Sequence, residues 1–141
     1  MPGWLQAEAQ SFREILSLRP ELQQRYGAFL DAVESSDQLP ERILTLCRAR
    51  IRQIHGAPAD SVSALEAEQL AAADFSAFTE DEQVALCVAE KMPYQHHQLQ
   101  DDEVDRVRSS YGEAGCVSLL TALAFFDVTC RLELTLGVGE S

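Results

Sequence analysis

The chain has 141 residues, of which 46% are hydrophobic and 24% charged, so it can bury a core of its own as a single domain over residues 1–141. Its formal net charge is −12, with 23 acidic residues against 11 basic ones. Nucleic acids and anionic membranes both select proteins with a positive surface. We therefore expect no nucleic acid and no membrane among its partners.

The cysteines and the N-terminal residues indicate a cytoplasmic protein. The first residues, MPGWLQAEAQ, lack the basic start and the apolar core of a secretory signal. The most apolar stretch, residues 116–138, contains three charged residues, which argues against a membrane span. Cys47, Cys87, Cys116 and Cys130 show neither a C-x-x-C pair nor zinc-ligand spacing. Such thiols are usually buried and free in a reducing compartment, so we expect no metal and no cofactor.

Helix signals begin near the N-terminus. A short helix is expected near residues 12–16, and a longer one over residues 20–34, which open on Pro20. The next segment, LPERILTLCRARIRQIHG, has Pro40 at its start and Gly56 at its end, an asymmetry typical of a helix. Its apolar residues recur every three or four positions on one face; they are Ile43, Leu44, Cys47, Ile51 and Ile54.

The second half of the chain continues the helical pattern. Two capping boxes each predict a helix start; they are Ser63 with Glu66 and Thr79 with Glu82. A further helix is expected from the acidic residues 101–103 to a stop at Gly112. The last segment, residues 114–136, is apolar almost all round, as in the central helix of a bundle. Because strand signals are absent, we predict an all-α domain of six or seven helices.

The order of these signals resembles the carboxymuconolactone decarboxylase family, in particular its alkyl hydroperoxidase D-like (AhpD-like) branch. Members commonly read L-P-x-R, then an apolar helix, then Gly and C-x-x-C-x-x-x-H. Here LPERILTLCRARIRQIHG matches the part of this pattern that precedes the cysteines. The later helices of the family are matched by EDEQVALCVAEKM, DDEVDRVRSSYGEAGCVSLL and ALAFFDVTCRLELTLGV. The likeness covers roughly residues 20–138. It implies an AhpD-like helical bundle that associates into a homo-oligomer, a trimer or hexamer in the family.

The residues that carry the redox chemistry of that branch are missing here. In the family's register the two thiol positions hold Ala57 and Asp60, the histidine position holds Ala64, and the relay glutamate falls at Thr45. A thiol peroxidase needs a thiolate of low pKa with a resolving thiol beside it. The family's disulfide chemistry is therefore not expected to carry over to this chain.

The cysteine-free decarboxylase branch suggests acid–base chemistry instead. It often uses a Glu four residues before a His, and Asp60 stands where that acid would be. A carboxylate acts as a base when burial or a charged partner adjusts its pKa, and His55 is five residues away. Asp60 and His55 are therefore the candidate catalytic residues. In the alternative interpretation, Asp60 only precedes one helix and His55 only ends another.

Arginines cluster near this candidate site. Arg48 and Arg52 lie one helical turn apart and are candidates to bind a small carboxylate together, with Tyr94 as a further pocket residue. The alternative, favoured by the many carboxylates in the chain, is that these arginines pair with acids of neighbouring helices or of another subunit. Asp127 and Arg131 form either an internal strut or part of a pocket wall.

The segment MPYQHHQLQDDE, residues 92–103, brings two histidines and three acids close together. Adjacent histidines point in different directions, so they rarely bind one ion together. We interpret this segment as a solvated loop between helices and predict no metal site.

Three functions remain open on the sequence. The first is a non-redox binding or assembly protein with a degenerate redox motif. The second is a lyase- or decarboxylase-like enzyme for a small organic acid, in which Asp60 and His55 move protons and Arg48 or Arg52 binds the carboxylate. The third is residual alkyl hydroperoxidase activity by another pair of thiols.

Overall fold

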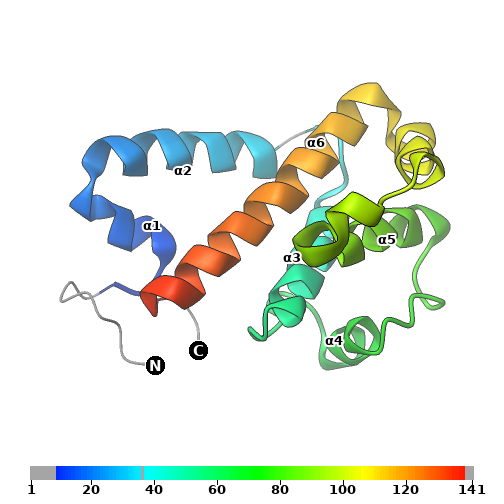
Figure 1. The fold of residues 1–141 in the computed structure, drawn as a ribbon, viewed down its shortest axis with the longest axis horizontal. Coiled ribbons are helices and arrows are strands. Elements are labelled where there is room, and N and C mark those ends of the chain that lie inside the picture. Colours follow the sequence, from blue (N-terminus) through cyan, green and yellow to red (C-terminus); the bar gives the residue numbers. More distant parts are fainter. Residues whose placement is uncertain (1–8, 36, 139–141) are drawn as a thin grey trace.

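The structure is a computed structural model that describes residues 9–35 and 37–138, and every regular element in that part of the chain is helical (Figure 1). The elements are α1 (Phe12–Ile15), α2 (Pro20–Glu34), α3 (Glu41–Ile54), α4 (Ala64–Ala71), α5 (Glu80–Gln95) and α6 (Asp101–Leu136), with short 3-10 turns at Leu16–Leu18 and His96–Gln98. The predicted all-α domain is thus confirmed, with six α-helices in the described residues.

Local sequence signals set most of the helix boundaries. The Ser63 side chain accepts from the Glu66 backbone N–H while the Glu66 carboxylate accepts from the Ser63 N–H, and Thr79 and Glu82 repeat this reciprocal pattern. Both predicted capping boxes are therefore confirmed. At the end of α3, Gly56 takes a φ of 82°, which glycine adopts without steric cost.

The helix α5 extends beyond its expected end. Residues 92–103 were expected to form a loop between helices, but the helix continues through Pro93 to Gln95. A proline inside a helix leaves one carbonyl without its usual N–H partner. The continuation places Tyr94 on the last turn of α5, beside the end of α3 and the C-terminal part of α6.

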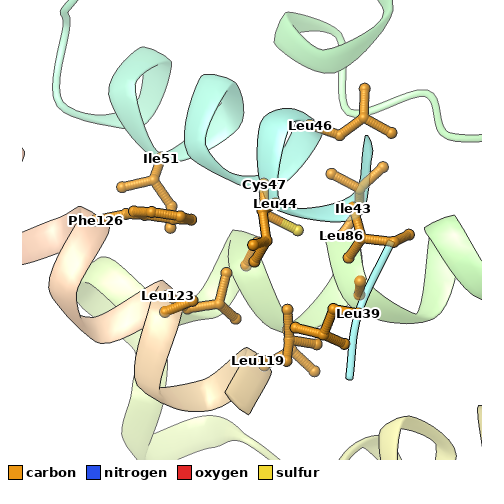
Figure 2. Close-up of a cluster of buried hydrophobic side chains, with 14 of the residues drawn as sticks. Leu39, Ile43, Leu44, Leu46, Cys47, Ile51, Leu86, Leu119, Leu123 and Phe126 are labelled. Atoms are coloured by element: carbon orange, nitrogen blue, oxygen red, sulfur yellow. The ribbon is translucent and has the colours of Figure 1, made fainter. Parts of the chain in front are cut away.

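The hydrophobic core lies where α3, α5 and α6 meet (Figure 2). Leu46, Leu86 and Leu123 come from these three helices and are fully buried. On the other side of α6, α2 packs through aromatic contacts, with the Phe29 and Phe125 ring centroids 4.6 Å apart. Figure 1 accordingly shows α6 between the α1–α2 pair and the remaining helices. Within the described residues α6 is also the one helix long and apolar enough to cross a membrane, a weak signal that the core helix of a soluble protein gives as well.

Gly112 breaks α6 into two parts. Its φ of 76° and ψ of 176° are not helical, so the predicted stop at this glycine is confirmed, although the helical pattern resumes at once. Three residues later, Gly115 lies against the Tyr111 side chain, and a Cβ at Gly115 would come within 2.6 Å of the Tyr111 Cβ. The break therefore lets the acidic first part of α6 and its long apolar second part point in different directions.

An arginine joins three helices near the start of α3. Arg42 donates from Nη2 to Glu66 of α4 and from Nε to Glu82 of α5, each at 2.7 Å. The hydrogen bond from Arg42 holds the pKa of Glu66 below its usual value. Burial alone would raise the pKa of Glu82, but hydrogen bonds from the Thr79 N–H and from Arg42 outweigh burial and lower it.

This cluster predicts a specific loss of stability in acid. Because the pKa values of Glu66 and Glu82 are lowered in the folded state, their contribution is complete above the unfolded value of about 4.3 and is lost as the pH falls towards the folded values. We expect urea unfolding of Arg42→Gln to show a shallower loss of stability below about pH 4.5 than the wild type. Arg106→Gln, which breaks an exposed pair, is the control; parallel pH profiles for wild type and Arg42→Gln would contradict the prediction.

Candidate functional site

A chain of hydrogen bonds joins the ends of α3 and α5 to the C-terminal part of α6. His55, which caps α3, contacts Oδ1 of Asp127 through Nε2 at 2.5 Å and the hydroxyl of Tyr94 through Nδ1 at 3.0 Å. The His55 side chain is 3% exposed and the Asp127 side chain 15%, whereas Tyr94 is 58% exposed. The hydrogen bonds therefore run from an almost buried carboxylate to a surface phenol.

Arg131 completes this cluster from α6. Its Nε donates to both oxygens of Asp127, at 3.1 and 3.2 Å, and its Nη2 donates to the backbone carbonyl of Pro93 at 2.8 Å. The guanidinium carbon lies 4.9 Å from the centre of the Tyr94 ring, a distance at which a cation is attracted to the aromatic face. The Asp127 carboxylate thus contacts both an arginine and a histidine. These two contacts offset the cost of holding a carboxylate mostly away from water.

The structure does not bring Asp60 and His55 together. Both ring nitrogens of His55 are hydrogen-bonded to other residues, and Asp60, with a 48% exposed side chain, lies 3.9 Å from Nε of Arg52. Asp60 follows the left-handed turn at Gly56 and stands on the loop before α4, so it is not on the helix that ends at His55. His55 instead contacts Asp127, which lies 72 residues further along the chain and was not predicted as its partner.

Arg52 and Arg48 form ion pairs with acidic residues of two different helices, α6 and α2. Arg52 donates to the carbonyl of Pro58 at 2.9 Å and lies 3.4 Å from Glu133 of α6. Burial raises the pKa of Glu133, although Arg52 acts against that rise. Arg48 contacts Glu34 of α2 at 3.2 Å. These contacts agree with the interpretation in which the arginines pair with acids of neighbouring helices, although Nε of Arg48 is buried without a hydrogen-bond partner among the described residues.

The cysteines lack the features of a reactive thiol pair. All four are free, and Cys47, Cys116 and Cys130 are buried. Burial raises the pKa of Cys47 to about 12 and also raises that of Cys130. Cys87 is exposed in a hollow of about 260 Å³ between α5 and α6, yet burial and the charge of Glu103 raise its pKa as well. A raised pKa disfavours the thiolate that attacks peroxides.

The two adjacent histidines lie on the surface after α5. His96 and His97 belong to the 3-10 turn His96–Gln98 and are both exposed. In residues 9–35 and 37–138, no group of three His, Cys, Asp or Glu side chains is placed to hold a metal ion. The acids that follow, Asp101–Glu103, form the first turn of α6, where they interact favourably with the helix dipole.

A second hollow, of about 200 Å³, lies on the face formed by α2 and α6. It is lined by Phe29, Ala32, Val33, Val117, Ser118 and Thr121. This lining carries no charged side chain. The hollow is therefore apolar, in contrast to the ionic cluster around Asp127.

Comparison with protein-family models, with curated proteins and with solved structures finds no match for this chain.

Proposed function

We propose that the chain is a non-redox assembly protein that binds a second copy of itself through the outer face of α6. The carboxymuconolactone decarboxylase-like sequence pattern is part of this proposal, since members of that family form trimers or hexamers. The single observation that carries the proposal is that α6 packs against α3 and α5 on one side and against α2 on another, while a further apolar side, which carries Val117 and Val128, is exposed.

The outer face of α6 is a continuous stripe. Its members follow one another at steps of three or four residues and so share one side of the helix; they are Val117, Thr121, Ala124, Val128 and Leu132. Val117 is 66% exposed, and Val128 and Leu132 are exposed as well. Apolar side chains that follow helical spacing on a surface are typical of a contact with another helix.

Charge supports a second copy as the occupant of this stripe. With a net charge of −12, two copies repel each other over most of their surfaces. Residues 114–126 carry no charged side chain, so the first part of the stripe, with Val117, Thr121 and Ala124, is a surface on which two copies can approach without that repulsion. The apolar hollow beside it, walled by Phe29 of α2 and Val117 of α6, can receive side chains from the second copy.

Val117→Glu tests this proposal. A carboxylate buried in an apolar contact loses its hydration, so we expect the variant to run as a 15.6 kDa monomer in size-exclusion chromatography with light scattering, while the wild type runs as an oligomer. Because Val117 is exposed in the single chain, the helical circular dichroism should not change.

Leu65→Glu is the matched control, because Leu65 is 63% exposed on α4 and receives the same added charge. It should keep the wild-type mass. If Val117→Glu has the wild-type mass, or if both variants dissociate equally, the outer face of α6 is not the contact.

A further inference from the structure

The outer face of α6 has the same order of side chains when it is read from either end. Thr121 and Ala124 lie on the two sides of its midpoint, and Val117 and Val128 lie at equal distances beyond them. Small side chains at a midpoint let two helices approach closely, and the two exposed valines supply apolar contact at each end. A second copy whose α6 runs in the opposite direction therefore places valine against valine and small residue against small residue.

The charges beyond the two valines have opposite signs. Glu113, before Val117, is exposed and forms no ion pair with the described residues. Arg131, after Val128, has a side chain that is 44% exposed, and its Nη1 makes no hydrogen bond to the residues that the structure describes. The 18 residues from Glu113 to Arg131 make about five helical turns, so both side chains lie on the same side of α6.

We propose that two copies of the chain pair their α6 helices in opposite directions, about a two-fold axis between Thr121 and Ala124. This inference rests on the proposed function, because it specifies how the second copy lies on the outer face of α6. Glu113 of each copy then lies beside the partner's Arg131, so the pair of charges forms twice. Helices that run in the same direction would instead bring like charges together at both ends of the contact.

The hollow between α2 and α6 fits the same arrangement. It has a volume of about 200 Å³ and lies beside Val117, with Phe29 of α2 as its other wall. In the antiparallel pair, the partner's Val128 lies opposite Val117 and therefore faces this hollow. Each copy both offers a hollow and fills one, so the contact closes with two copies and leaves neither hollow open.

Disulfide cross-linking between single-cysteine variants tests the direction of the two helices. The variants Val117→Cys and Val128→Cys are made in a Cys87→Ser background, because Cys87 is exposed whereas the other three cysteines are buried. In the antiparallel pair, residue 117 faces residue 128 of the partner, whereas the two copies of residue 117 lie about 17 Å apart along the helix axis. That distance is too long for a disulfide. After mild oxidation, we expect a band of twice the 15.6 kDa chain on a non-reducing gel only when the two variants are mixed.

The outcomes separate this inference from the proposed function. If each variant cross-links alone, the helices run in the same direction; if no sample cross-links although the chain sediments as an oligomer, they are not paired through this face in opposite directions. Either result overturns the inference. A chain that sediments as a single copy at every concentration would remove the proposed function as well. The Cys87→Ser background alone is the control and should give no cross-link.

Glu113→Arg tests the charge pair. The variant places an arginine beside the partner's Arg131 in both halves of the contact, so we expect the dissociation constant measured by sedimentation equilibrium to rise about tenfold. Glu68→Arg is the matched control, because Glu68 is exposed on α4 and the substitution changes the net charge equally. It should not weaken the association. Equal dissociation constants for the two variants would show that Glu113 does not face Arg131.

Discussion

Replacing Asp127 with alanine is expected to lower the free energy of unfolding by about 3 kcal/mol. Asp127 is the shared acceptor of His55 and Arg131, and the His55 side chain it contacts is nearly buried. Removing one member of a buried ionic cluster leaves its partners without compensation, which costs more than the loss of an exposed pair. Urea unfolding followed by circular dichroism measures the change.

Asp102→Ala provides the control for Asp127→Ala. Asp102 and Arg106 form an exposed pair four residues apart on the first part of α6, with both side chains 65% exposed. Such a pair contributes about 0.5 kcal/mol or less. A loss of stability of the same size for Asp102→Ala and Asp127→Ala would show that the cluster around His55 does not join the helices as its contacts suggest.

Replacing Gly112 with alanine is expected to destabilise the protein by about 2 kcal/mol. The φ of 76° and ψ of 176° at this position belong to a backbone region that essentially only glycine occupies. A Cβ would meet no other group there, so the cost comes from the backbone conformation and not from crowding. Thermal and urea unfolding of the variant measure this cost.

Gly27→Ala should raise the stability of the protein, whereas Gly112→Ala should lower it. Gly27 lies inside α2, and a Cβ added to it would have no neighbour within 4 Å. Alanine is favoured over glycine in a helix by about 0.5–1 kcal/mol, so this variant should be more stable than the wild type. Equal effects of the two glycine substitutions would mean that Gly112 does not hold α6 in its broken conformation.

Much of the fold follows from local signals that the sequence displays. The capping boxes at Ser63 and Thr79 act within four residues, and the stop at Gly112 depends on one backbone conformation. Local signals were less informative for the end of α5, because residues 92–103 were expected to form a loop between helices. Pro93 stays in the helix, and its carbonyl oxygen accepts from Arg131, a contact with a helix far along the chain.

The candidate site depends on contacts that local patterns do not encode. His55 lies 39 residues from Tyr94 and 72 from Asp127, and these residues meet only because α3, α5 and α6 pack together. The one local signal was the spacing of Asp127 and Arg131, which suggested a strut or a pocket wall without naming its partners. Asp60 was assigned from its position after Gly56, but the turn at that glycine places it next to Arg52.

The exposed apolar face of α6 could be predicted from the sequence only in part. An apolar segment over residues 114–136 predicts a helix with core contacts all round, as a central helix of a bundle has. In the structure, the α3 and α5 side covers Leu119 and Leu123, while Val117 and Val128 remain exposed. The same residue pattern therefore describes both a helix buried inside one chain and a helix shared between two chains, and packing alone distinguishes them.

Sedimentation equilibrium of the wild-type chain over a range of micromolar concentrations measures most directly whether the outer face of α6 binds a second copy. We expect a mass that is a multiple of the 15.6 kDa chain and that shifts towards the single chain on dilution. A mass of 15.6 kDa at every concentration would contradict assembly through α6.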